Sequence, residues 1–156
     1  MDIMSFLNDR AVSCGVKSTS KPEIIREMVE LLVKAGVIRD KDVDHLVETL
    51  LEREALGSTG IGQSVAIPHA KSNCVSHLVA AFGVSPAGVK FDSLDGEAVH
   101  LFFLLVAPED SAGPHLKALA RISRLLKDRH FRDSLRRAKD ERELVRIIRE
   151  EDERRH

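Results

Sequence analysis

Two almost continuously apolar runs constrain the fold of this chain most strongly. Residues 78–84 read Leu-Val-Ala-Ala-Phe-Gly-Val, and residues 99–106 read Val-His-Leu-Phe-Phe-Leu-Leu-Val. A strand with one face in water alternates apolar and polar residues, whereas a strand covered on both faces does not. Because each run is much shorter than a membrane-spanning helix, both are expected to be central strands of a sheet covered by helices on two sides, an α/β fold.

Helical patterns precede these runs. Ser20 and Glu23 form a capping box, and apolar residues then recur at helical spacing as far as Gly36, which is expected to end the helix. A second helix is expected from about Asp40 up to the glycine-rich segment that follows. The buried positions expected in these two helices are Ile24, Met28, Leu31, Leu32 and Ala35, then Val43, Leu46, Val47, Leu50 and Leu51.

Helices are also expected in the C-terminal third. Pro114 is expected to open a long helix, Phe131 and Leu135 mark a short one, and Asp140 with Glu143 forms a second capping box. The buried stripe expected in the long helix is Leu116, Leu119, Ala120, Ile122 and Leu126. The last segment, Glu-Glu-Asp-Glu-Arg-Arg-His, is expected to fray. Residues 11–16 and 65–67 are expected to form short strands, and residues 93–96 a turn.

Composition argues against several classes of function. The formal net charge is −1, so no global field draws the chain toward nucleic acid or an anionic membrane. Trp and Tyr are absent, which leaves few side chains on which bases could stack. From Arg121 onward, 13 of the 24 basic residues are interleaved with nine acidic ones, which is typical of a solvated helical surface. We therefore expect neither nucleic-acid binding nor membrane insertion.

The cellular compartment is inferred from the first residues and the cysteines. The N-terminal segment Met-Asp-Ile-Met-Ser-Phe-Leu-Asn-Asp-Arg contains acids and no sustained apolar run, so it does not look like an export signal. We expect a cytoplasmic protein in which Cys14 and Cys74 are reduced structural thiols. A length of 156 residues is typical of a single domain.

The pair Pro68-His69 is the most informative candidate site. It ends a segment, residues 57–69, that contains three glycines and three small hydroxyl residues and cannot form a regular helix. Imidazole, with a pKa of about 6.5, is a neutral nucleophile at cellular pH and a good phosphoryl acceptor. The glycines let backbone N–H groups approach an anion closely. Alone, the pair is a weak signal, because a lone histidine is more often structural than functional.

Two further residues favour an anion site around His69. Arg53 lies just before the glycine-rich segment, near the expected C-terminal end of the second helix, and its guanidinium could bind phosphate oxygens. It could instead compensate the helix dipole or pair with a surface acid. His115 follows Pro114 at an expected helix start, where N–H groups and the dipole favour an anion. It could instead be an exposed residue of the first turn.

Taken together, these motifs resemble those of a known protein family. The runs EREALGSTGIGQSVAIPHAK (residues 52–71) and PHLKALARIS (residues 114–123) resemble the IIA domains of the fructose–mannitol class of the bacterial phosphotransferase system, which includes stand-alone nitrogen-regulatory IIA proteins. The resemblance covers nearly the whole chain. It implies one IIA domain over residues 1–156, with a mixed sheet sandwiched between helical layers. Ser64 departs from the family pattern, which usually has glycine there, and this puts close backbone approach at that position in question.

The resemblance implies a phosphotransferase that acts as a phosphoryl carrier. His69 would be phosphorylated by the phosphohistidine carrier HPr or its nitrogen-branch counterpart. His115 would help to hold the phosphoryl group, and Arg53 would lie at the same site. No metal or organic cofactor is required. We expect in-line transfer through a loose transition state, with Thr59 and Gly60 framing the pocket and a shallow apolar rim for the partner.

Several alternative functions are also compatible with the sequence. A nitrogen-regulatory protein would act on a kinase or transporter, and the absence of IIB and membrane IIC segments favours it. A fructose- or mannitol-specific component would instead donate to a IIB partner. A metal-dependent hydrolase using His69, Cys74, His77 and His115 lacks paired ligands at helical spacing. A serine hydrolase using Ser58 or Ser64 lacks a Gly-x-Ser-x-Gly elbow. The histidines expected to be incidental are His45, His77, His100, His130 and His156, with His100 a satisfied core or edge residue.

Overall fold

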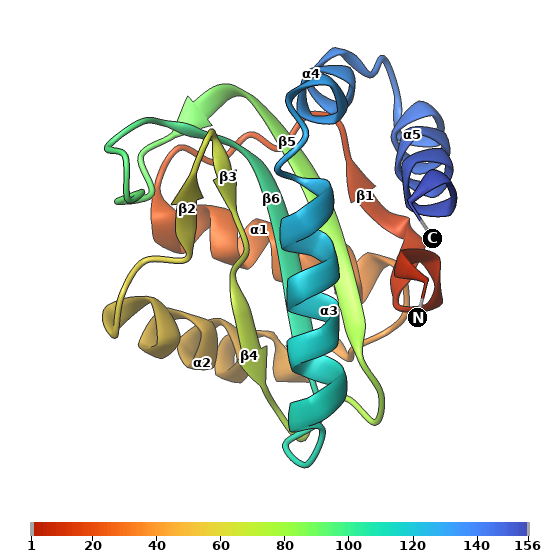
Figure 1. The fold of residues 1–156 in the computed structure, drawn as a ribbon. Helices are drawn as coiled ribbons and strands as arrows, with labels where there is room; N and C mark the ends of the chain where they lie inside the picture. The colour runs from red at the N-terminus through yellow and green to blue at the C-terminus, as the bar shows by residue number, and fades with distance from the viewer. Residues whose placement is uncertain (1, 156) are drawn as a thin grey trace.

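The computed structural model describes residues 2–155 and has a sheet between two helical layers (Figure 1). The chain begins with the 3-10 turn η1 (Ile3–Ser5), strand β1 (Leu7–Ser13), helix α1 (Lys21–Lys34), the 3-10 turn η2 (Asp40–Asp42) and helix α2 (Val43–Ala55). Five strands follow: β2 (Gly60–Gly62), β3 (Val65–Ala66), β4 (His69–Lys71), β5 (Val79–Val89) and β6 (Val99–Ala107). Helices α3 (Ala112–Leu125), α4 (Arg129–Arg137) and α5 (Glu141–Arg154) complete it.

The sheet is mixed, as the resemblance implied. Its strand order is β1-β5-β6-β3-β2, and β4 also pairs with β6. Strands β5 and β6 are antiparallel, whereas β1 pairs with β5, and both β3 and β4 pair with β6, in parallel. Val65 in β3 lies opposite Leu101, and His69 in β4 lies opposite Leu105. The two short strands therefore form one interrupted line along β6, and Pro68 lies at the interruption.

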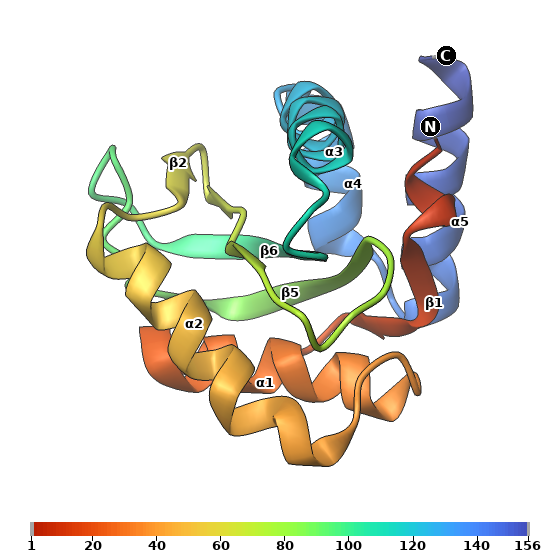
Figure 2. The ribbon, with the colours of Figure 1, turned by 90° about the horizontal axis from the view of Figure 1, so that it is seen from below.

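Strand β6 explains why the apolar runs do not alternate. One set of its side chains packs with α1 and α2, and the other set packs with α3, α4 and α5 (Figure 2). The first set includes Phe102, Leu104 and Val106, and the second comprises Leu101, Phe103 and Leu105. The expected α/β architecture with both sheet faces covered is confirmed, and its core is divided in two by the sheet.

The predicted helix caps are also confirmed. The Ser20 side chain accepts the Glu23 N–H at 3.4 Å, and the Asp140 side chain accepts the Glu143 N–H at 2.8 Å. Gly36, with φ 78°, directly follows Ala35, the C-cap residue of the first helix. Each cap depends on residues within three positions of each other, so it can be read from the local sequence.

The first strand was predicted in the wrong place. It begins at Leu7 rather than Ala11 and ends at Ser13 rather than Val16. Residues 8–10 are polar and partly or fully exposed, which concealed the start of the strand in the sequence. They are tolerated because β1 is an edge strand of the sheet.

The predicted orientation of α3 was wrong at two positions. Leu116 is 67% exposed and Ala120 is exposed, while His115 and Ala118 point into the protein and Ile122 is buried as expected. Helix α3 carries apolar residues on more than one side, so their spacing alone does not determine which side is buried. The helix turns His115 toward the sheet and leaves Leu116 on the surface.

The prediction that the C-terminal segment frays was wrong for residues 150–155. Helix α5 continues to Arg154, and Glu151 and Asp152 are buried. Asp152 accepts the Ile3 N–H at 2.8 Å and a hydrogen bond from Arg121 Nε at 2.6 Å. Asp152 resembles a solvated acid in the sequence because both of these partners are more than 30 positions away. His156 lies outside the described residues.

We expect Ser64→Gly to stabilise the protein. Gln63 and Ser64 form the turn between β2 and β3 with φ values of 58° and 67°. A left-handed conformation destabilises a non-glycine residue by about 1–2 kcal/mol, and Ser64→Gly removes this strain. The variant loses about 0.5–1 kcal/mol of that gain, because glycine has more conformational freedom in the unfolded chain. The net gain in the free energy of unfolding should be about 0.5–1 kcal/mol, measurable by urea denaturation.

The matched control is Ser76→Gly. Ser76 is exposed and is not among the residues with positive φ. That variant should not gain stability, because its serine is not strained. A loss of stability in Ser64→Gly would show that the hydrogen bond from Ser64 Oγ to the Ala98 carbonyl, 3.3 Å long, outweighs the backbone strain.

Candidate functional site

A pocket of about 430 Å³ lies over β4, between α2 and the first half of α3. Figure 1 shows β4 passing between these two helices. The pocket brings together all three residues that the sequence singled out, Arg53, His69 and His115. The other lining residues are Thr49, Ala70, Lys71, Ala112, Leu116 and Leu119.

His69 is the first residue of β4 and is partly buried. Its Nδ1 lies 2.8 Å from the Ile67 carbonyl oxygen, and because a carbonyl can only accept, Nδ1 carries the proton. The other ring nitrogen, Nε2, therefore holds a lone pair. Burial lowers the pKa of His69, the Ile67 hydrogen bond opposes this, and the charge of Arg53 lowers the pKa further. The ring is thus neutral at neutral pH, with its Nε2 lone pair unprotonated.

His115 lies in the first turn of α3 and is 6% exposed, which excludes the reading of an exposed first-turn residue. Its ring centroid is 5.4 Å from that of His69, in an edge-on arrangement. Burial, together with the charges of His69 and Lys71, lowers the pKa of His115 to about 4. Its Nε2 is buried without a hydrogen-bond partner among residues 2–155. Such an atom is costly, and a ligand oxygen in the pocket would satisfy it.

Arg53 lies in the last turn of α2 and folds back over the glycine-rich segment. Its Nη1 donates to the Gly57 carbonyl at 2.8 Å. No acidic side chain pairs with it in the part of the chain that the structure describes. The guanidinium is therefore held beside the pocket with further N–H groups available for a ligand.

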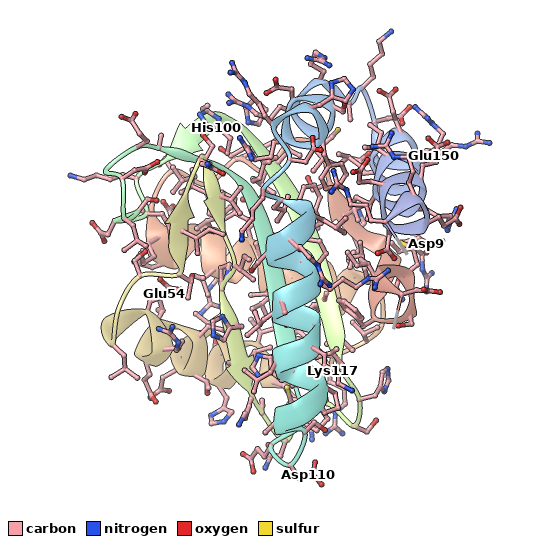
Figure 3. All side chains as sticks on the ribbon, viewed as in Figure 1. Asp9, Glu54, His100, Asp110, Lys117 and Glu150 are labelled. Atoms are coloured by element: carbon pink, nitrogen blue, oxygen red, sulfur yellow. The ribbon has the colours of Figure 1, made fainter. Side chains whose placement is uncertain are left out.

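The glycine-rich segment is anchored from behind by Glu54, which is buried at the end of α2 (Figure 3). Glu54 accepts the Thr59 N–H at 3.1 Å, a hydrogen bond from the Thr59 hydroxyl, and one from Lys21 Nζ at 3.2 Å. Gly60 packs so closely that a Cβ there would lie 3.0 Å from Ser93 Cα. Thr59 and Gly60, expected to frame the pocket, fix this segment but are not among the residues that line it.

The alternative chemistries find little support in the geometry. Among residues 2–155, no group of three or more His, Cys, Asp and Glu side chains could hold a metal ion. Ser58 and Ser64 donate to backbone carbonyls, at 2.7 and 3.3 Å, rather than to a histidine. His100, labelled in Figure 3, is satisfied as expected, with Nδ1 2.8 Å from the Ser85 carbonyl.

Cys14 and Cys74 are both free, as expected for reduced thiols. None of the helices formed by residues 2–155 has the length and apolar character that crossing a bilayer requires.

Sequence reasoning missed Lys71 and Thr49 as pocket residues. Lys71 lies two residues after His69 in β4, and such residues share a face, but the sequence predicted no strand at residues 69–71, so this signal could not be read there.

The buried His115 should make stability depend on pH. Its folded pKa of about 4 lies below the unfolded value near 6.5, so the unfolded chain binds the proton first as the pH falls. Stability from this group is complete above pH 6.5 and is lost between about pH 6.5 and 4. Between pH 7 and 4.5 we expect a loss of about 2–3 kcal/mol.

This loss can be assigned to His115 by comparing pH dependences. Urea denaturation at pH 7 and 4.5 should show a shallower decline in His115→Asn than in the wild type. His130→Asn, on an exposed position of α4, should decline as the wild type does. Identical declines in all three proteins would contradict a neutral, buried His115.

Comparison with known proteins identifies the family of the chain. The family described as "Phosphoenolpyruvate-dependent sugar phosphotransferase system, EIIA 2" matches residues 5–151. The fructose-specific EIIABC component of Bacillus subtilis is 40% identical over 152 residues, which is 97% of this chain and 24% of that protein. The chain thus spans about a quarter of that relative's length. A nitrogen regulatory protein of Bradyrhizobium diazoefficiens is 36% identical over 148 residues, 95% of each chain.

A solved structure supports the same assignment. The crystal structure of the nitrogen regulatory protein IIA-Ntr from Neisseria meningitidis superposes with a TM-score of 0.84 at 32% identity, covering 94% of this chain and 98% of the other. The resemblance inferred from the motifs is therefore confirmed, while relatives of both the nitrogen-regulatory and the sugar branch are present. The chain belongs to the EIIA 2 family of the phosphoenolpyruvate-dependent sugar phosphotransferase system, a family of phosphoryl carriers.

Proposed function

We propose that this protein accepts a phosphoryl group on His69 Nε2 from a phosphorylated HPr-like carrier in the cytoplasm and passes it to a downstream protein. One observation carries the proposal. The Ile67 carbonyl binds Nδ1 of His69, which leaves the Nε2 lone pair as the nucleophile in a residue that lines the same pocket as Arg53 and His115. This is the arrangement that phosphoryl transfer between two imidazoles requires.

The transfer needs no acid or base. The Nε2 lone pair forms a bond to phosphorus while the phosphorus–nitrogen bond of the donor breaks, and that electron pair returns to the donor ring. The Nδ1 proton stays on His69, bound to the Ile67 carbonyl. The protein contributes position and charge. Arg53 donates to the phosphoryl oxygens, and a nitrogen of the neutral His115 ring donates a further hydrogen bond.

The partner docks on the apolar surface beside the pocket. Leu116 is 67% exposed, and Ala112 and Leu119 line the pocket next to it. An apolar surface of this small extent is suited to a modest affinity, which a carrier needs in order to release its partner. These contacts account for recognition of a carrier protein rather than a small phosphorylated metabolite.

Incubation with phosphorylated HPr, and separately with its nitrogen-branch counterpart, tests the proposal. Intact mass spectrometry should show one added phosphoryl group, and mapping at alkaline pH, where phosphohistidine survives, should place it on His69. Failure to take up phosphate from both donors, or uptake at another residue, would overturn the assignment.

For the downstream step, we propose a nitrogen-regulatory role in which the phosphorylation state of His69 controls a kinase or transporter. The support is that the Bradyrhizobium and Neisseria nitrogen-regulatory proteins align along 95% and 98% of their lengths. The second candidate is donation to a sugar-specific IIB protein, favoured by the 40% identity to the Bacillus fructose component. Incubating the phosphorylated protein with purified fructose- and mannitol-specific IIB separates them: rapid transfer supports the second.

A further inference from the structure

Lys71 shares a face of β4 with His69. Within β4, His69 lies opposite Leu105, Ala70 opposite Val106 and Lys71 opposite Ala107. Ala70 belongs to the core beneath α1 and α2. Because side chains alternate along a strand, His69 and Lys71 stand on the other face, the one covered by α3, with their Cα atoms about 6–7 Å apart.

The structure also places Lys71 in the pocket with the candidate phosphoryl site. It lines the same cavity as Arg53, His69 and His115. Its charge contributes to lowering the pKa of His115, so the two side chains are close enough to interact electrostatically. Lys71 is exposed and makes no ion pair with the acidic side chains of residues 2–155. Its ammonium group is therefore available to an anion that enters the pocket.

The negative charge of a phosphoryl group explains what a cation at Lys71 would do. A phosphoryl group carries close to two negative charges at neutral pH. Arg53 supplies one positive charge, and His115 is neutral at that pH because its pKa is about 4. Among the nine residues that line the pocket, the only other permanently charged side chain is that of Lys71. Arg53 and Lys71 together would then offer two cations to the phosphoryl oxygens in a partly buried site.

We propose that Lys71 is a catalytic residue of the transfer, a second cation whose ammonium contacts the phosphoryl oxygens from β4 while Arg53 contacts them from α2. The proposal rests on the proposed phosphorylation of His69. Lys71 stays protonated throughout and takes no part in the exchange of bonds, in which the new Nε2–phosphorus bond replaces the donor's phosphorus–nitrogen bond. Lys71 stabilises the negative charge of the phosphoryl group both in the transition state and after transfer to His69.

The test uses a small phosphoryl donor, phosphoramidate, beside the phosphorylated HPr-like protein. A small donor removes any effect of Lys71 on docking. Lys71→Met should be phosphorylated about 10–100-fold more slowly with both donors, and Lys71→Arg should recover most of the rate. The control is Lys117→Met, which removes the same charge from an exposed position of α3 outside the pocket, labelled in Figure 3, and should react within about twofold of the wild-type rate.

A second measurement, the pKa of the phosphoryl group, would not change if Lys71 had only a structural role. Phosphorus NMR titration of the phosphorylated protein reports the pKa of the phosphoryl group. Losing a cation that touches it should raise this pKa by about 0.5–1 unit in Lys71→Met but not in Lys117→Met. Because Lys71 is exposed, the variant is expected to fold, and circular dichroism verifies this.

The outcomes separate this proposal from the one on which it rests. Wild-type rates and an unchanged phosphoryl pKa in Lys71→Met, with His69 still labelled, would overturn the role of Lys71 alone. Slower transfer from the protein donor but normal transfer from phosphoramidate would also overturn it, because Lys71 would then act on docking. If the wild-type protein takes up no phosphate from either donor, both proposals fail.

Discussion

His69→Ala is expected to abolish phosphoryl uptake from the phosphorylated carrier. The substitution removes the His69 ring, in which a hydrogen bond holds the proton on Nδ1 and leaves Nε2 with its lone pair. Among the residues that line the pocket, no other ring has this hydrogen bond. A nucleophile that forms the covalent intermediate has no substitute, so the rate should fall by at least about a thousandfold. Intact mass spectrometry over a time course of donor incubation measures the loss.

The control for this experiment is His130→Ala, an exposed position on α4 that is not among the pocket residues. It should be labelled at the wild-type rate. Phosphorylation of His69→Ala at an unchanged rate would mean that another side chain is the acceptor, and His115, whose Nε2 has no partner among residues 2–155, would be the first to examine. Loss of labelling in both variants would point to a general loss of activity.

Arg53→Met should show the second-largest effect, a fall of about 100–1,000-fold in the rate of phosphoryl transfer. The Arg53 guanidinium is held by the Gly57 carbonyl and needs no reorganisation when charge develops on the phosphoryl oxygens. Arg53→Lys should recover only part of the rate, because an ammonium cannot bind the carbonyl and two phosphoryl oxygens in one plane. Single-turnover rapid-quench measurements with the phosphorylated donor give the rates.

Arg26→Met is the matched control for Arg53. Arg26 is an exposed arginine on α1, paired at 2.9 Å with Asp44, which is more exposed still. Such a pair contributes under about 1 kcal/mol, and its loss should leave transfer unchanged. If Arg53→Met transferred phosphate as fast as Arg26→Met, Arg53 would be a capping residue of α2 and not a ligand of the phosphoryl group.

The features that could be predicted from the sequence are those set by neighbouring residues. Ser20 with Glu23 and Asp140 with Glu143 define helix starts within three positions, and two unbroken apolar runs define strands covered on both faces. The candidate site was predictable for a different reason. Its three residues lie in motifs that resemble a family, and the structure brings those motifs to one pocket.

The features that could not be predicted depend on contacts between distant segments. Asp152 is buried because Ile3 and Arg121 reach it, and no local pattern distinguishes it from a solvated acid. The rotation of α3 is decided by how its whole surface packs on the sheet, so the spacing of its leucines could not show that Leu116 is exposed. Lys71 became a pocket residue only when α3 was seen to cover its face of β4.

The hydrogen bond between Ile3 and Asp152 has a practical consequence for handling the protein. It joins the first and last segments beside β1, at the sheet edge away from β4, as Figure 1 shows. A dye, an affinity handle or a neighbouring module attached at either end would therefore emerge on the far side of the molecule. A visiting donor could still reach the imidazole unhindered, so immobilising the chain by its ends should preserve turnover.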